Sequence, residues 1–374
     1  MNTSSTLAID LPSGWETAAD RALAIDGVIM ILGGPDRGKS TFCRYLLGRA
    51  RAESRPAAFI DGDLGQSHLG PPATLGLNFY PPRPPDDSGL FPDVLYFIGQ
   101  TSPPGRMMEL VVGLRHLADI ARRRGQYRII VNTSGFIGGP AAHRLKLAKA
   151  ESLTPRLVIG LQQEQELASI LAPLQRFRPE AVLTLPVSAQ AQPKPFQQRR
   201  LYRQERFAAY FQTARLRHFP LEHLAWLGFP FGQGRLLPAA SQQWLGQILN
   251  HTPVLRAEEV AQGFIVLVDR RLTESDLAAT EAELGQKKIY WAQWRQLEYR
   301  LVGLLDRHLL TLALGLLPPS PWNHQFLGIV TPLPADRLSQ VKFCRLGKMR
   351  LSPDGQELFG ANTRFAPADG PVGA

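Results

Sequence analysis

The 374-residue chain has few of the features that mark secreted and membrane proteins. It has two cysteines, Cys43 and Cys344, which are too few for a disulfide framework and indicate a reducing compartment. No apolar run approaches the roughly 18 residues that a membrane span needs. The first 11 residues lack the basic and apolar blocks of a secretory signal. We therefore predict a cytoplasmic protein that does not bind membranes.

The chain also lacks internal repeats and long stretches of simple composition. Its 44% hydrophobic and 20% charged residues are typical of globular proteins and exclude a mainly disordered chain. At about 100–200 residues per domain, the length predicts two domains. The formal net charge of +10 is compatible with a polyanionic partner but does not by itself identify one.

Short apolar runs alternate with longer amphipathic ones across residues 27–187. Runs that are apolar throughout are typical of strands covered on both faces, so we predict an α/β fold with a mainly parallel sheet covered by helices. The predicted strands are residues 28–32, 57–60, 94–98, 128–131, 157–161 and 182–185. The predicted helices are residues 39–50, 106–124, 141–150, 164–174 and 196–213.

From about residue 215, apolar segments spaced by Gly and Pro replace this pattern and predict a smaller β-rich domain. A helix is predicted over residues 274–305, with Tyr290, Trp291 and Trp294 as core side chains. The predicted organisation is a short N-terminal segment (1–25), an α/β domain (26–215) and a β-rich C-terminal domain (216–374).

The strongest motif follows the first predicted strand and opens the first predicted helix. It fits G-x-x-x-x-G-K-[ST] and reads Gly33-Gly34-Pro35-Asp36-Arg37-Gly38-Lys39-Ser40-Thr41. Glycines let successive N–H groups turn toward phosphate oxygens, and the helix N-terminus adds partial positive charge. We therefore predict a P-loop NTPase domain, with Lys39 on the β/γ-phosphates and Ser40 on Mg²⁺. A Gly-rich turn without a ligand is the alternative.

Carboxylates end the second predicted strand, in the sequence Asp61-Gly62-Asp63-Leu64-Gly65-Gln66. The carboxyl ends of parallel strands are where ligands bind in such sheets. Asp63 would hold Mg²⁺ through water or accept a proton from an attacking hydroxyl, and Gln66 would orient that nucleophile or the γ-phosphate. Alternatively, Asp61 and Asp63 only cap a turn.

Two further segments complete the predicted site. Asn132 and Thr133 end another predicted strand and would reach the same crevice, unless they form an ordinary strand-to-helix turn. Residues 194–217 carry seven Lys and Arg against one Glu, a local charge of +6. Helical spacing puts Arg199 and Arg203 on one face of this segment. A mobile Arg stabilises a transferring phosphoryl group, so the segment is either a lid over the phosphates or a solvated basic face.

Together these elements resemble the polynucleotide 5′-hydroxyl-kinase family, which includes the RNA kinase subunit of the mRNA 3′-end cleavage complex and kinases of pre-ribosomal RNA processing. That family has a Walker A loop, a D-x-x-Q Walker B motif, a T-x-G-W clasp and an R-x-x-x-R lid. Here residues 63–66 match D-x-x-Q and residues 199–203 match the lid. The clasp is matched by Thr133-Ser134-Gly135-Phe136, where Phe136 replaces Trp. Eukaryotic members also have a folded N-terminal domain that helps hold the adenine. Only about 25 residues precede the first predicted strand here, so we expect residues 185–189 to contact the adenine.

The resemblance implies an ATP- and Mg²⁺-dependent kinase that acts on the 5′-hydroxyl ends of RNA, or also of DNA. It implies that Asp63 is the general base and that Ser40 and Asp63 are the metal-binding residues. Gln66 and Thr133 would position the γ-phosphate or the nucleophile. Basic side chains would then clamp the transferring group, namely Arg199 and Arg203 with support from Lys194 or Arg206. Others would contact the nucleic-acid strand, with Arg106, Arg122, Arg123 and Arg124 as candidates.

Two other functions remain open at this stage. One is a P-loop GTPase or ATPase that switches a partner by hydrolysis, although no guanine-reading N-K-x-D follows the strand at residues 157–161. The other is a kinase-like scaffold that binds ATP without turnover in an RNA-processing complex. The intact Lys39, Asp63 and lid arginines favour activity over the scaffold.

Overall fold

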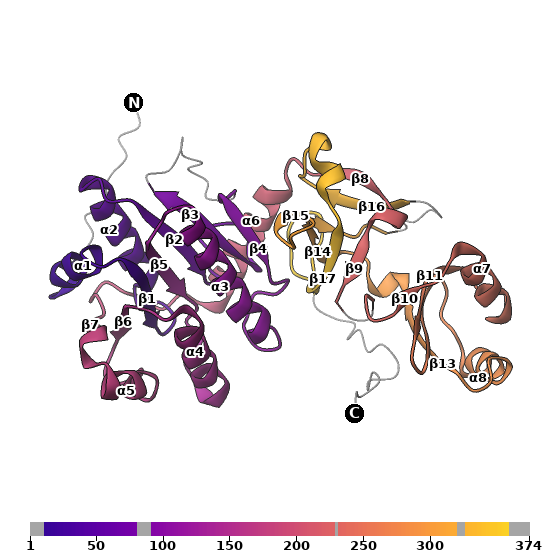
Figure 1. Cartoon of the computed structure of the whole chain (residues 1–374), viewed down its shortest axis with the longest axis horizontal. Helices are drawn as coiled ribbons and strands as arrows, with labels where there is room; N and C mark the ends of the chain where they lie inside the picture. Colours follow the sequence, from indigo (N-terminus) through magenta and orange to yellow (C-terminus); the bar gives the residue numbers. More distant parts are fainter. Residues whose placement is uncertain (1–10, 81–90, 229–230, 320–325, 359–374) are drawn as a thin grey trace. The chain divides into compact units, whose positions relative to one another are not determined.

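The computed structural model describes residues 11–80, 91–228, 231–319 and 326–358. Contacts within the chain cluster into two compact units that divide between Arg206 and Phe207, inside helix α6 (Phe196–Phe211) (Figure 1). Within the described ranges, no helix is both long and apolar enough to cross a bilayer. Both cysteines are buried free thiols, and the cytoplasmic location stays a prediction.

The N-terminal unit is built on a sheet with the strand order β7-β6-β1-β5-β2-β3-β4. The first five strands in this order are parallel, and β3 and β4 run antiparallel to their neighbours. The mainly parallel sheet is therefore confirmed, while β3 was not predicted. The strands are β1 (Gly27–Gly33), β2 (Ala57–Gly62), β3 (Thr74–Tyr80), β4 (Val94–Phe97), β5 (Arg128–Thr133), β6 (Leu157–Gln162) and β7 (Val182–Pro186).

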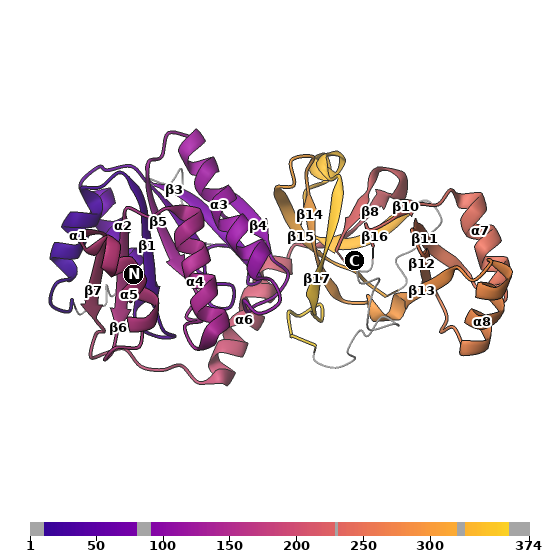
Figure 2. The same ribbon diagram turned by 60° about the horizontal axis from the view of Figure 1, so that its bottom comes forward.

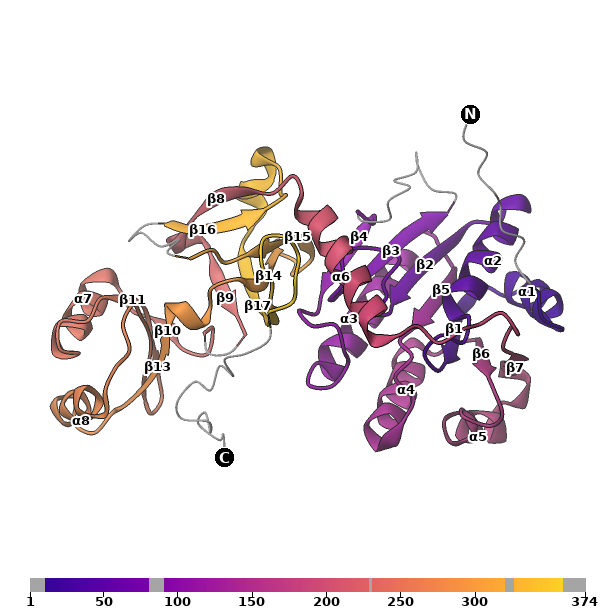
Figure 3. The same cartoon turned by 180° about the vertical axis from the view of Figure 1, so that it is seen from behind.

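Helices cover both faces of this sheet, with α3, α4 and α5 on one side and α1 and α2 on the other (Figures 1 and 3). These helices are α1 (Trp15–Leu23), α2 (Lys39–Ala52), α3 (Met107–Arg123), α4 (Gly139–Leu153) and α5 (Ala168–Phe177). Helix α1 was not predicted from the sequence. Its buried residues Trp15, Ala18, Ala19 and Ala22 recur at helical spacing and pack into the same core as Phe42 of α2.

The C-terminal unit is rich in strands, as predicted, and contains two sheets. One has the order β8-β16-β15-β14-β17-β9, and the other has the order β10-β11-β12-β13 with α7 and α8 on one face (Figure 2). Buried side chains from both sheets share one core. The elements are β8 (Arg215–Pro220), β9 (Ala225–Leu227), β10 (Arg235–Leu236), α7 (Ala239–Ile248), β11 (Val254–Val260), β12 (Gly263–Val268), α8 (Glu274–Glu283), β13 (Lys288–Gln293), β14 (Arg300–Leu305), β15 (Thr311–Leu316), β16 (Phe326–Thr331) and β17 (Phe343–Arg350).

The helix predicted over residues 274–305 is wrong beyond its first ten residues. Helix α8 ends at Glu283, and Gly285 and Gln286 then adopt φ angles of 66° and 67°, which reverse the chain. Residues 288–293 form β13, which pairs in parallel with β12. Aromatic and β-branched residues favour this strand, and only the pairing with β12 distinguishes it from a buried helix. Trp294 still lies in the core, as predicted, in a 3₁₀ turn.

Candidate nucleotide and phosphoryl-transfer site

The P-loop, residues 33–41, connects the buried strand β1 to the N-terminus of α2. Its conformation depends on glycine, because Gly38 has a φ of 80° and a Cβ at Gly33 would lie 2.7 Å from the Leu161 carbonyl oxygen. Asp36 also adopts a positive φ, of 56°. Helix α2 begins at Lys39, so its unpaired N–H groups face the loop as an anion-binding end.

Lys39 is only 6% exposed, and its ammonium lies inside the loop. Its Nζ donates a hydrogen bond of 2.5 Å to the carbonyl oxygen of Gly34. Burial lowers the pKa of the ammonium, and the charge of Asp63 works in the opposite direction. A phosphate oxygen in place of that carbonyl would give the buried cation the counter-charge that it lacks in the loop.

The ends of β2 and β5 bring a carboxylate and an amide to the P-loop serine. Parallel pairing sets Asp61 beside Asn132, and Asn132 Nδ2 donates to Asp61 Oδ1 at 3.0 Å and to Ser40 Oγ at 3.3 Å. Asp61 is fully buried and also accepts hydrogen bonds from the backbone N–H groups of His68 and Leu69. Burial raises the pKa of this carboxyl group, while the His68 charge and hydrogen bonds lower it. Asp61, to which no role in transfer was assigned from the sequence, is thus connected to Ser40 through Asn132.

Asp63 and Gln66 lie in the turn that follows β2. Asp63 Oδ1 accepts hydrogen bonds from the backbone N–H groups of Gly65 and Gln66, each at 3.1 Å. Gln66 Nε2 donates to the Gly65 carbonyl oxygen at 3.0 Å. One oxygen of Asp63 therefore caps the turn, as the alternative interpretation proposed, and the roles of Asp63 and Gln66 in transfer stay predictions.

The clasp, residues 133–136, packs directly on the P-loop. A Cβ at Gly135 would lie 2.6 Å from the backbone nitrogen of Pro35, so only glycine allows this approach. The Thr133 hydroxyl is fully buried and donates to the Ile31 carbonyl oxygen at 2.8 Å. It also accepts a hydrogen bond of 2.9 Å from Lys146 Nζ on α4.

Lys146 was not predicted, although the sequence carried a signal for it. The buried face of α4 includes residues 142, 146, 149 and 153, and the lysines at 146 and 149 interrupt an otherwise apolar stripe at helical spacing.

The lid helix α6 is attached to both loops of the site. Arg199 Nη2 lies 2.5 Å from Asp36 Oδ2 of the P-loop, and the backbone N–H of Lys194 donates to the same oxygen at 2.9 Å. On the other side, Tyr202 and Arg206 donate to backbone carbonyl oxygens of the loop after β2, at 2.7 and 2.9 Å. Arg203 is 8% exposed. The predicted lid residues therefore lie at the P-loop and at the turn that holds Asp63.

Two contacts at the rim of the P-loop were not predicted. Arg37 forms a bidentate ion pair with Glu166, at 2.8 and 2.9 Å, and this hydrogen bonding raises the pKa of the guanidinium. Trp15 of α1 donates from Nε1 to the carbonyl oxygen of Pro186 at 3.3 Å and lies 3.8 Å from a Cβ built at Gly38. The loop predicted to contact adenine is thus held near the P-loop through Trp15, and its role in binding adenine stays a prediction.

Three of the four arginines predicted to contact a nucleic-acid strand have partners within the N-terminal unit. Arg106 pairs with Glu109 at 2.7 Å, and Arg122 pairs with Asp119 at 2.9 Å. The guanidinium of Arg124 lies 4.9 Å from the centre of the Phe79 ring. Strand contacts by these arginines stay a prediction.

Comparison with known proteins agrees with this geometry. Residues 33–213 match the family model described as mRNA cleavage and polyadenylation factor CLP1 P-loop. A polyribonucleotide 5′-hydroxyl-kinase from Pyrococcus furiosus is 27% identical, covering 95% of this chain and 96% of the relative. One from Methanocaldococcus jannaschii is 28% identical, covering 88% of each chain. The polyribonucleotide 5′-hydroxyl-kinase Clp1 of Xenopus laevis is 28% identical over 51% of this chain and 45% of its own length.

A solved structure extends the likeness in fold. Clp1p, from its complex with Pcf11p, superposes with a TM-score of 0.58 at 12% sequence identity, covering 93% of this chain and 82% of that one. The P-loop, clasp and lid all lie within residues 33–213, so this part of the chain matches the CLP1 P-loop family, and the chain as a whole is similar to the polyribonucleotide 5′-hydroxyl-kinases.

Proposed function

We propose that this protein is an ATP-dependent polynucleotide 5′-hydroxyl kinase, which transfers the γ-phosphate of ATP to the 5′-hydroxyl end of RNA. One observation carries the proposal: Asp36 of the P-loop binds both the guanidinium of Arg199 and the backbone of Lys194. This contact brings a basic lid to a phosphate cradle, which phosphoryl transfer requires. The names of the archaeal relatives, which align along nearly the whole chain, support RNA as the acceptor.

The chain's own residues suggest how transfer would proceed. Backbone N–H groups and the α2 N-terminus would hold the phosphates, and Lys39 would exchange the Gly34 carbonyl for a phosphate oxygen. Asp63 would accept the proton of the 5′-hydroxyl as its oxygen bonds to the γ-phosphorus. The bond between the γ-phosphorus and the β,γ-bridging oxygen breaks, and ADP leaves with the electron pair of that bond. Gln66 and the lid arginines would orient the groups and offset the developing charge.

The residues around Ser40 fit Mg²⁺. Their possible metal ligands are hard oxygen atoms. Asn132 Oδ1 is a buried hydrogen-bond acceptor with no protein partner among the described residues. Ser40 would hold the ion directly, and Asp63 would do so through water, with Asp61 connected to Ser40 by Asn132. When bound with ATP, Mg²⁺ neutralises charge on the phosphates.

One assay distinguishes the kinase from a hydrolase and from a silent scaffold. The protein is incubated with γ-labelled ATP and with 5′-hydroxyl RNA, 5′-hydroxyl DNA and water as competing acceptors. We expect label on the RNA end, and label on the DNA end would extend the substrate class. Free phosphate without end labelling would contradict the proposal and indicate a hydrolase. No product at all would favour the silent scaffold.

The lid is tested separately with Arg199→Ala. Loss of the guanidinium is expected to lower kcat by about a hundredfold or more, since an arginine at the transferring phosphoryl group contributes about 10³–10⁵ to kcat in P-loop GTPases. ATP affinity should remain measurable by calorimetry. Arg176→Ala, at an exposed position on α5, is the matched control for loss of a positive charge. Equal kcat in the two variants would refute a catalytic role for the lid.

A further inference from the structure

Helix α4 buries two lysine side chains completely, which is costly for a charged group. Lys146 and Lys149 are both 0% exposed, and neither forms an ion pair within the described ranges. Burial lowers the pKa of both ammonium groups, that of Lys149 to about 8. Buried lysines without a carboxylate are rare in proteins unless they serve a purpose that offsets their desolvation.

The two lysines differ in what they contact. Lys146 Nζ donates to Thr133 Oγ1 at 2.9 Å and to the Ser134 carbonyl oxygen at 2.5 Å. Lys149 Nζ has no hydrogen-bond partner in the part of the chain that the structure describes. A comparison of variants at these two positions therefore separates the effect of burying a lysine from the effect of its contact with the clasp.

The hydrogen bonds of the Thr133 hydroxyl also limit the contacts that the clasp can make with a phosphate. Its one proton is donated to the Ile31 carbonyl oxygen of β1, so in this arrangement it is not available to a phosphate. Its oxygen accepts from Lys146, and the ammonium thereby connects the end of β5 to α4. In this conformation, Thr133 links strands and helix instead of donating to substrate.

A short chain of contacts leads from Lys146 to the P-loop. Lys146 holds the carbonyl of Ser134, and the next residue, Gly135, lies against the backbone of Gly34 and Pro35. The Gly34 carbonyl in turn accepts the hydrogen bond from Lys39 Nζ. Any shift of the clasp backbone would therefore move the carbonyl that orients the P-loop lysine.

We propose that Lys146 is a positioning residue for phosphoryl transfer, whose ammonium holds the clasp against the P-loop so that Lys39 and the γ-phosphate meet in the correct geometry. This inference rests on the proposed kinase function. It assigns no contact between Lys146 and the substrate; the residue acts through Ser134 and Gly135.

The test compares Lys146→Met with Lys149→Met, which remove the same charge from the same helix face and keep a stem of similar size. Lys146→Met is expected to lower kcat for 5′-hydroxyl RNA about a hundredfold, because misplacement by about 1 Å costs that much. KM for ATP should change less than the rate. Amide hydrogen exchange in residues 132–138 should become about tenfold faster, as expected for the loss of a buried hydrogen bond. Lys149→Met should leave both kcat and exchange at the wild-type level.

Wild-type kcat and exchange in Lys146→Met would overturn the inference, and so would equal losses in the two variants. If wild-type protein labels no RNA end, the proposed function fails, but the exchange comparison still decides whether Lys146 holds the clasp. Should Lys146→Met not fold, Lys146→Gln and Lys149→Gln replace the pair. The same results would then support or overturn the inference.

Discussion

In the C-terminal unit, the buried side chains of Arg256 and Glu258 form an ion pair of 2.8 Å and are only 7% and 1% exposed. Glu258 also accepts hydrogen bonds from backbone N–H groups of residues 232–234. In the N-terminal unit, Lys39 has only a backbone carbonyl and Lys149 has no partner among the described residues. The difference teaches that the complete pairing of Arg256 and Glu258 accompanies a structural role, whereas the incompletely paired Lys39 lies in the loop where an anionic ligand is expected.

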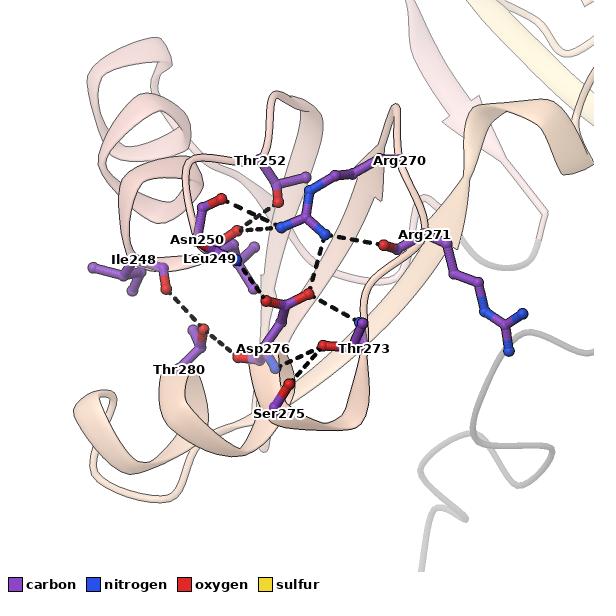
Figure 4. Close-up of polar contacts among 10 residues, drawn as sticks. All are labelled: Ile248, Leu249, Asn250, Thr252, Arg270, Arg271, Thr273, Ser275, Asp276 and Thr280. Atoms are coloured by element: carbon purple, nitrogen blue, oxygen red, sulfur yellow. Dashed lines mark hydrogen bonds and ion pairs between the residues drawn. The ribbon is translucent and has the colours of Figure 1, made fainter.

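Asp276 gives a second example of full pairing in the C-terminal unit (Figure 4). Its carboxylate accepts hydrogen bonds from the backbone N–H of Thr273 at 3.0 Å, from Arg270 at 3.1 Å and from Asn250 at 3.0 Å. These contacts join the turn after α7 to the capped start of α8. The bonds from Thr273, Arg270 and Asn250 lower the pKa of Asp276 below its usual value.

The largest expected effect comes from the incompletely paired Lys39. Lys39→Ala should lower transfer to 5′-hydroxyl RNA by at least about a hundredfold, because it removes a preorganised cation from the phosphates. Thermal stability should not fall, since the side chain makes one hydrogen bond and carries a buried charge. Single-turnover labelling measures the rate of transfer, and a melting curve measures the thermal stability. Lys288→Ala, an exposed lysine in the C-terminal unit, is the control, and equal activity in the two variants would break the comparison.

The fully paired Glu258 should show the opposite behaviour. Glu258→Ala leaves Arg256 buried without its carboxylate and is expected to cost about 3–5 kcal/mol of unfolding free energy. Urea denaturation measures this loss, while ATP affinity of the folded protein should be unchanged. Adding Arg256→Met should recover part of the stability because the unpaired charge is removed. A double variant as unstable as the single one would contradict this account.

Replacement of Lys149 by an uncharged side chain is expected to stabilise the folded protein by an amount that depends on pH. Its folded-state pKa of about 8 is below the ordinary value of about 10.4, so below pH 8 the folded state bears the full cost of a buried charge. Lys149→Met should therefore raise the unfolding free energy at pH 7 by up to about 3 kcal/mol. The gain should shrink as the pH rises from 8 toward 10. A gain that is constant over this range would show that Lys149 is not the titrating group.

The smallest effect is expected at Asp276. Because its folded-state pKa is lowered, the stability that it contributes is present above about pH 4 and is lost as the pH falls below that value. Asp276→Ala should lower the melting temperature at pH 7 by less than Glu258→Ala does, and the difference from wild type should disappear in acid. Glu274→Ala, in the same helical turn but exposed, serves as the control. Equal shifts in both variants would assign the effect to the helix dipole alone.

Much of the N-terminal unit could be predicted because its signals are local. The P-loop motif, the apolar runs of β1, β2 and β5, and the basic helix α6 can each be recognised within one short stretch of the chain. Parallel strands then bring their carboxyl ends to one edge, which is why Asp61 and Asn132 could be expected near Ser40.

Other features depend on partners that are distant in the chain. β13 was mistaken for helix because a short apolar run does not show which strand it will pair with. Lys146 contacts Thr133 from another element, and Asp36 contacts Lys194 across 158 residues.

The sequence by itself determined the phosphate-binding loop, the mainly parallel sheet and the family resemblance, because glycine conformation and hydrophobic period act locally along the chain. Only the tertiary structure decided which polar groups are already paired. In the folded chain the Thr133 hydroxyl donates its proton to the Ile31 carbonyl oxygen, and one oxygen of Asp63 accepts a hydrogen bond within its own turn. The buried ammonium of Lys146 donates to the clasp. Hydrogen-bond partners are set by packing between distant segments, so no spacing within the sequence could specify them.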